Sequence, residues 1–98
     1  MKLRELIEAV KDRQLSKTQL EVYRDDSVSL FALMKLEMAG IEKEEALYLN
    51  AATEDSHVAR KRAWKATHKG LRQIELDNYL GAVSKMIDSL KSRLYSVY

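Results

Sequence analysis

The sequence predicts an all-α protein, and three observations support this prediction. The 98 residues include no Pro and only three Gly, so the residues that most often interrupt a helix are nearly absent. Alternating β-branched runs bounded by turn residues, the usual signature of strands, are missing. Good helix formers such as Glu, Lys, Leu and Ala dominate. We expect one all-α domain over residues 1–98, an elongated helical hairpin or small bundle that oligomerises through a coiled-coil-like C-terminal helix.

A short N-terminal helix is expected over residues 1–14, because four apolar side chains there share one helical face: Leu3, Leu6, Ile7 and Val10. Ser16 is a candidate N-cap for the next helix, since its hydroxyl can accept from free amides of the first turn. Gln19 stands where it would complete a capping box. A long helix is then expected over residues 17–55.

Gly40 lies inside the apolar stripe of this long helix, which steps by three and four residues from Leu20 to Ile41. A helix that passes through a glycine loses about 1 kcal/mol relative to alanine. Gly40 could instead end the helix as a C-terminal cap. We prefer the continuous helix.

The positive charge is concentrated in residues 56–74. That basic segment holds six Lys/Arg and no acid, whereas residues 1–55 hold 8 Lys/Arg and 12 Asp/Glu, and residues 75–98 hold three of each. The overall net charge of +2 hides this asymmetry.

The clearest periodicity belongs to a heptad helix expected over residues 75–98. Its large aliphatic side chains step by four and three residues, as in a coiled coil: Leu76, Leu80, Val83, Ile87, Leu90, Leu94 and Val97. We favour self-association through this seam, and an intramolecular bundle core is the alternative. Thr67 could cap this helix, or the helix could run on unbroken from the basic segment.

The basic segment has two interpretations. Its cations form a ridge at helical spacing, and such a ridge gains free energy by neutralising phosphates. The candidate nucleic-acid-binding residues are Arg60, Lys61, Arg62, Trp64, Lys65, Lys69 and Arg72. Trp64 could stack on an unpaired base or pack in the core. Alternatively, the cations pair with acids of the first half, for example Glu42, Glu44 and Glu45.

No enzyme is expected. Three scattered glycines cannot form a phosphate-binding loop, and there is no Cys for a thiolate nucleophile or zinc site. Glu54 and His57 form a single Glu-x-x-His pair, whereas di-iron bundles need a second copy. His57 and His68 share a helical face without carboxylates between them, a weak metal site. We expect no cofactor, no metal and no membrane span, and a cytoplasmic location, in a host cell if the chain is phage-encoded.

The order of features resembles a known family. An acid-rich helix with FALMKLEMAGIEKEEAL precedes the basic VARKRAWKAT, the T-x-x-G of Thr67–Gly70, and a helix ending in IDSLKSR. Over roughly residues 20–95 this layout is similar to small phage recombination proteins of the UvsY type. The resemblance implies a helical, ring-forming mediator that binds single-stranded DNA and helps to load a recombinase in place of single-strand-binding protein. It maps the DNA contacts to the six cations of the basic segment and the assembly helix to residues 76–97.

We therefore expect a non-enzymatic, self-associating protein that binds single-stranded DNA, with a recombinase or single-strand-binding protein as a further partner. The alternative is a small helical protein-interaction module, for example a phage inhibitor of a host system, without nucleic-acid binding.

Overall fold

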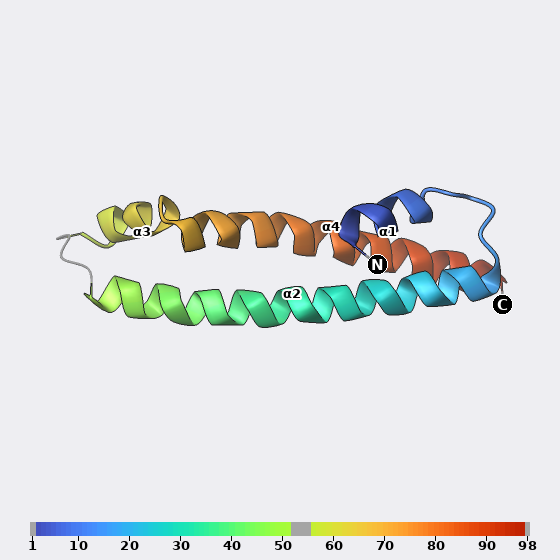
Figure 1. Ribbon diagram of the computed structural model, residues 1–98, viewed down its shortest axis with the longest axis horizontal. Coiled ribbons are helices and arrows are strands. Elements are labelled where there is room, and N and C mark those ends of the chain that lie inside the picture. Colours follow the sequence, from blue (N-terminus) through green and yellow to red (C-terminus); the bar gives the residue numbers. More distant parts are fainter. Residues whose placement is uncertain (1, 52–55, 98) are drawn as a thin grey trace. The chain divides into compact units, whose positions relative to one another are not determined.

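The computed structural model describes residues 2–51 and 56–97, and these residues form four helices and no strand (Figure 1). The helices are α1 (Leu3–Val10), α2 (Lys17–Ala51), α3 (His57–Lys65) and α4 (His68–Val97). The predicted all-α class is confirmed.

Helix α2 begins and continues as the sequence predicts. Ser16 Oγ accepts from the Gln19 amide at 3.2 Å, and Gln19 Oε1 accepts from the Ser16 amide at 2.9 Å, which completes the capping box. The helix passes through Gly40, where an added Cβ would meet no atom within 4 Å. The prediction that the helix continues through Gly40 is therefore correct. The predicted end at residue 55 lies outside the described residues.

The basic segment is divided between two helices. Ser56 caps α3, because its Oγ accepts from the Ala59 amide at 3.0 Å. Thr67 caps α4, because its Oγ1 accepts from the Gly70 amide at 3.0 Å. The capped alternative is thus the correct one, and the C-terminal helix begins at His68 instead of residue 75.

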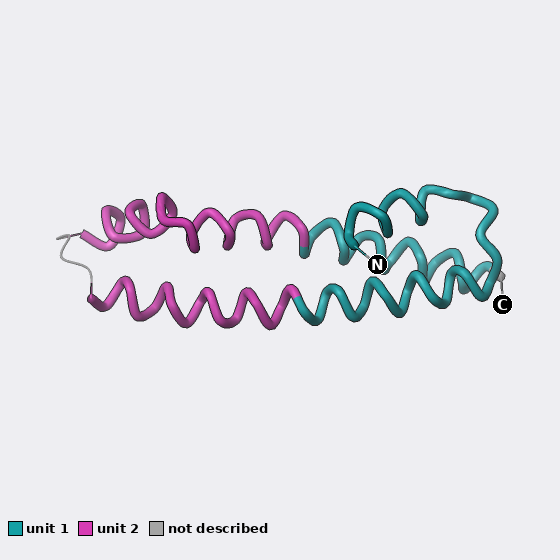
Figure 2. Tube along the Cα trace, in the orientation of Figure 1, with its two compact units in different colours: residues 1–33, 80–98 teal, residues 34–79 magenta. Residues whose placement is uncertain are grey.

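The chain forms two compact units, which Figure 2 shows in two colours. Unit 1 contains Met1–Leu33 and Leu80–Tyr98, and so includes α1, the first part of α2 and the last part of α4. Unit 2 contains Met34–Tyr79, and so includes the rest of α2, all of α3 and the start of α4. The candidate nucleic-acid-binding residues all belong to unit 2.

In unit 1, a buried leucine and two hydrogen bonds from an arginine of α4 attach α1. Its Leu6 side chain is fully buried. Arg93 of α4 donates to the Val10 carbonyl at 2.8 Å and also to the Asp12 carbonyl. The last carbonyls of a helix have no partner within the helix, so Arg93 satisfies acceptors that the end of α1 would otherwise leave to water.

The heptad seam of α4 faces the interior of the chain. Between 0 and 9% of each of six side chains is exposed: Leu76 in unit 2, and Leu80, Val83, Ile87, Leu90 and Leu94 in unit 1. The Val97 side chain lies outside the described residues. The seam therefore forms an intramolecular core, which was the less favoured alternative. Side chains that are already covered are not free to pack on a second copy, so self-association needs another surface.

Candidate nucleic-acid interface

Trp64 of α3 belongs to the core of unit 2. Only 3% of the residue is exposed, and its ring centroid lies 5.4 Å from that of Tyr48 on α2. Its Nε1 donates to Gln73 Oε1 at 2.8 Å, which satisfies the polar end of the indole. Of the two alternatives for Trp64 the structure shows the core one, and in this position its ring face is not available to a base. The other core residues of this unit are Met34, Met38, Ile41 and Leu76.

A tight junction between α3 and α4 holds Trp64 in place. The Trp64 carbonyl accepts from the Thr67 amide at 2.9 Å and from Thr67 Oγ1 at 2.6 Å. Gly70, in the first turn of α4, is buried against the same carbonyl: an added Cβ would lie 2.0 Å from the Trp64 oxygen. Glycine is required at this position because the two backbones approach closely. The backbone conformation is not the reason, since none of the described glycines has a positive φ.

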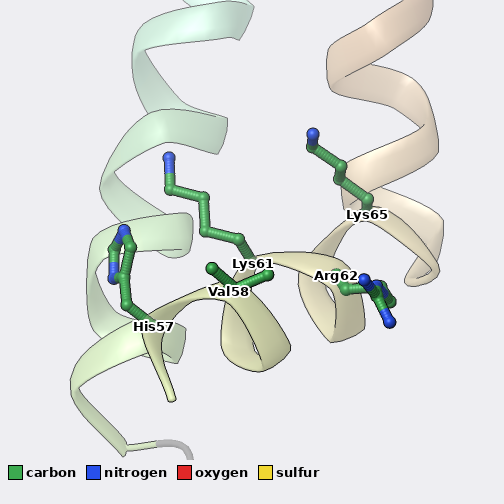
Figure 3. A pocket seen from close by; sticks show the side chains of 5 residues that line it. All are labelled: His57, Val58, Lys61, Arg62 and Lys65. Atoms are coloured by element: carbon green, nitrogen blue, oxygen red, sulfur yellow. The ribbon is translucent and has the colours of Figure 1, made fainter.

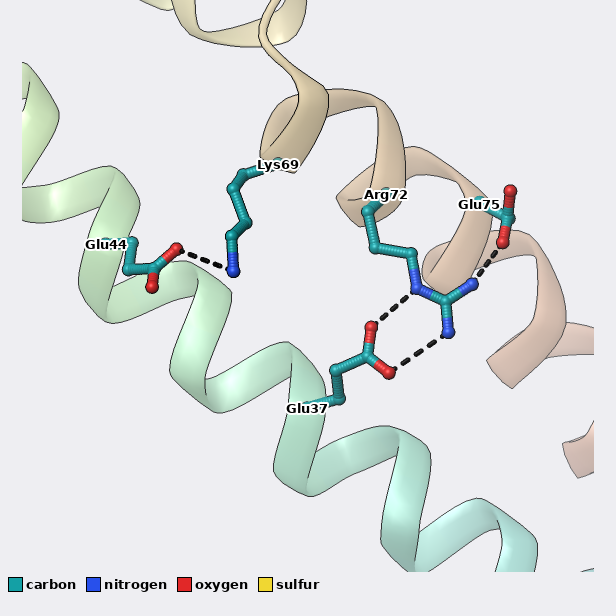
Figure 4. Close-up of polar contacts among 5 residues, drawn as sticks. All are labelled: Glu37, Glu44, Lys69, Arg72 and Glu75. Atoms are coloured by element: carbon teal, nitrogen blue, oxygen red, sulfur yellow. Dashed lines mark hydrogen bonds and ion pairs between the residues drawn. The ribbon is translucent and has the colours of Figure 1, made fainter.

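Two cations of the predicted set are paired with acids of α2 (Figure 4). Arg72 contacts both carboxylate oxygens of Glu37, with its Nε at 2.6 Å and its Nη2 at 3.0 Å, and it also donates to Glu75. The Lys69 Nζ atom lies 3.4 Å from Glu44 Oε2. A bidentate guanidinium–carboxylate pair is the strongest of these contacts. Arg72 and Lys69 therefore fit the alternative in which the basic segment pairs within the chain.

The hydrogen bond from Arg72 lowers the pKa of the Glu37 carboxyl below its ordinary value, and desolvation opposes this shift only in part. The same bond raises the pKa of Arg72 above its ordinary value. Both side chains remain about 40% exposed, so solvent and salt screen the interaction.

This pKa shift leads to a prediction about acid. Because the pKa of Glu37 is lower in the folded chain than in the unfolded one, the stability that its ionised form contributes is present above the ordinary carboxyl pKa. That stability is lost as the pH falls through the folded pKa. The wild-type chain should therefore lose more stability than Glu37→Gln between neutral pH and the acid range, in urea unfolding at low salt. Glu42→Gln is the control, because Glu42 makes no hydrogen bond or ion pair with the described part of the chain. Equal acid sensitivity of wild type and Glu37→Gln would contradict the assignment.

Arg60 also has partners within the chain. Its Nη1 donates to the Leu49 carbonyl of α2 at 3.3 Å, and its Nε donates to the Ser56 carbonyl at 3.5 Å. Leu49 lies in the last turn of α2, where carbonyls lack helical partners and cations interact favourably with the helix dipole. Arg60 thus caps the C-terminal end of α2 by binding one of its last carbonyls.

The remaining three cations, Lys61, Arg62 and Lys65, are exposed and make no hydrogen bond or ion pair within residues 2–51 and 56–97. Figure 3 shows the Lys61 and Lys65 side chains extending to one side of α3 and Arg62 to another, with His57 and Val58 beside them. These five residues line one open hollow. We call them the cationic surface of α3.

Sequence reasoning identified part of this arrangement. Of the acids expected to pair with the basic segment, Glu44 binds Lys69, and Glu45 accepts from Gln73 at 3.4 Å. Glu42 makes no hydrogen bond or ion pair with the residues that the structure describes. The pairing of Glu37 with Arg72 was not predicted. A signal for it exists, because α2 and α4 run antiparallel: a step back along α2 from Glu44 to Glu37 corresponds to a step forward along α4 from Lys69 to Arg72.

Searches against protein-family models, curated proteins and solved structures found no match. Within the described residues, no helix is long and apolar enough to cross a membrane. The same residues contain no group of three or more potential metal ligands, and Glu54 of the Glu-x-x-His pair lies outside them.

Proposed function

We propose that this protein is a non-enzymatic, self-associating, single-stranded-DNA-binding protein that contacts DNA through the cationic surface of α3. One observation supports the proposal most directly: Lys61, Arg62 and Lys65 lie within two helical turns, are exposed, and form no ion pair with any acid of residues 2–51 and 56–97. Like charges at this spacing destabilise a helix. Phosphates relieve the repulsion, and released counterions add a favourable entropy.

The apolar part of the surface favours a single strand over a duplex. The Val58 residue is 66% exposed between cationic neighbours. An unpaired base can cover an aliphatic side chain while its phosphate meets a lysine, whereas bases within a duplex are stacked on each other. The proposed binding set is therefore narrower than the one predicted from sequence. Trp64 is part of the core, and Arg60, Lys69 and Arg72 already have partners.

The resemblance to the UvsY type supports a narrower role, in which the protein helps to load a recombinase onto a strand held by single-strand-binding protein. That role requires DNA binding first, so the DNA experiment also tests its premise.

The experiment is a fluorescence-anisotropy titration of a labelled single-stranded oligonucleotide at several salt concentrations. Three phosphate contacts should give a slope of log K against log salt of about −2, since each contact to a single strand contributes about −0.7. The triple variant Lys61→Glu, Arg62→Glu, Lys65→Glu should lose binding at least about 100-fold, because three attractions become repulsions. A duplex of the same sequence should bind more weakly.

The control carries the same total charge at other sites. Lys2→Glu, Lys85→Glu, Lys91→Glu also takes the net charge from +2 to −4, because each substitution changes it by −2. Those three lysines are exposed and lie in unit 1. If both triple variants lose affinity equally, binding depends on net charge and the α3 site is not supported. If wild type binds no oligonucleotide at physiological salt, the protein-interaction alternative is favoured.

A further inference from the structure

The part of α2 in unit 2 has an outer face that none of the described residues covers. Leu36 and Leu47 are 72% and 63% exposed, on the side of the helix opposite the buried Met34, Met38 and Ile41. Between the two leucines lie Gly40, where an added Cβ would meet open space, and Lys43. Lys43 is the one charged residue among these four, and the two leucines are large apolar side chains left in solvent.

The spacing of these four residues is self-complementary. From Leu36 through Gly40 and Lys43 to Leu47 the steps are 4, 3 and 4 residues, so the spacing is the same in both directions along the helix. An antiparallel pairing about a two-fold axis between residues 41 and 42 therefore sets Leu36 opposite Leu47 of a second copy, twice. The same axis sets Lys43 opposite Gly40 of the copy. A parallel pairing would instead place the two lysines together.

Size and charge also fit this register. The missing side chain at Gly40 leaves room for the aliphatic stem of the opposing Lys43. Glu37 and Glu44, one turn on either side of Gly40, border the face, so the Lys43 ammonium meets two carboxylates of the copy. Both carboxylates are already balanced by Arg72 and Lys69, so their approach to the copy's acids is not strongly repulsive. Exposed Ala39 and Ala46 border the other side and allow close approach of the helices.

We propose that two copies of this protein associate antiparallel through the outer face of α2, here named the α2 dimer face: Leu36, Gly40, Lys43 and Leu47. The proposal gives the self-association in the proposed function a surface, and rests on that part of it, but not on DNA binding. A dimer carries two cationic surfaces of α3 on opposite outer sides, so a DNA strand long enough to span both gains affinity through avidity.

The first experiment measures mass without DNA. Three helical turns bury less than a standard interface, so we expect a dissociation constant of about 10 µM. Sedimentation equilibrium across that concentration should show monomer converting to dimer. Leu36→Glu, Leu47→Glu should remain monomeric, because four carboxylates would replace the apolar contacts. Its helicity should not change, since both positions are exposed. The control Leu71→Glu, Ile74→Glu alters exposed apolar residues of α4 in the same unit and should still dimerise.

The second experiment determines the orientation. The chain has no cysteine, so single cysteines can be introduced without background. Mixing Leu36→Cys with Leu47→Cys under oxidising conditions should give the mixed disulfide in preference to either symmetric one. In the proposed register the two 36 positions lie about 16 Å apart along the axis, at 1.5 Å per residue, too far for a disulfide.

Three results would overturn the proposal. The first is a chain that stays monomeric at ten times the expected dissociation constant. The second is a dimer that survives Leu36→Glu, Leu47→Glu. The third is a preference for the symmetric Leu36→Cys disulfide, which would indicate a parallel pair. Because no DNA is present, failure here would leave the oligonucleotide result standing, and failure of the oligonucleotide test would leave the dimer standing.

Discussion

Gly70→Ala is expected to destabilise the protein by about 2 kcal/mol or more, although alanine is the better helix former by about 1 kcal/mol. The reason is the junction of α3 and α4. A Cβ at this position would lie 2.0 Å from the Trp64 carbonyl oxygen and 2.8 Å from the Lys65 Cα. Both are backbone atoms, which cannot rotate away as a side chain can. The Trp64 oxygen is also held by two hydrogen bonds from Thr67.

Gly40→Ala is the matched control, because it makes the same chemical change inside a helix where the added Cβ meets nothing within 4 Å. It should stabilise the chain by about 1 kcal/mol. Urea unfolding, followed by far-ultraviolet circular dichroism at a protein concentration well below the expected dimer dissociation constant, measures both variants as monomers. The opposite signs are the expected result, and stabilisation by Gly70→Ala would show that α3 and α4 do not meet as described.

Trp64→Ala is expected to cost about 3–5 kcal/mol, the usual range for removing a buried tryptophan. The substitution removes the large indole ring from the core of unit 2. Its contact with Tyr48 and its hydrogen bond to Gln73 are lost with it. Trp64→Phe keeps an aromatic ring in the core but leaves Gln73 Oε1 without its donor, and should cost about 1–3 kcal/mol. Unfolding in urea provides the comparison, and a loss below 1 kcal/mol for Trp64→Ala would contradict the buried position.

The same residue separates a core role from a DNA-contacting one. Trp64 is the only tryptophan, so its fluorescence reports this one site. Adding an oligonucleotide should not quench it, because a buried ring does not stack on a base. Trp64→Leu should keep its affinity for DNA under conditions where it is folded. Strong quenching together with lost affinity would restore the base-stacking role.

Local signals in the sequence predicted much of the fold. The capping box of Ser16 and Gln19 and the unbroken stripe through Gly40 are properties of neighbouring residues, and α2 begins and continues accordingly. At the boundary between α3 and α4 the sequence left two alternatives open, a cap at Thr67 or an unbroken helix, and the Ser56 cap was not predicted. Both caps lie beside good helix formers, so the residue pattern alone does not decide between an interrupted helix and a continuous one.

What a heptad packs against is not a local property. The spacing from Leu76 to Leu94 predicts an apolar seam whether its partner is the same chain or another one, and here the chain covers it. The same limit applies to the candidate site. Charge counting located the six cations, but only the placement of α3 and α4 beside α2 separates the exposed Lys61 and Lys65 from Arg72 in its ion pair.

The bonds from Arg93 to the end of α1 have a consequence for the order of events during synthesis. An eight-residue helix is too short to persist alone in water. The Val10 carbonyl and the arginine that binds it are separated by 83 positions. During synthesis, α2, α3 and most of α4 are therefore made before Arg93, and the Val10 carbonyl has only water as its partner until this arginine leaves the ribosome.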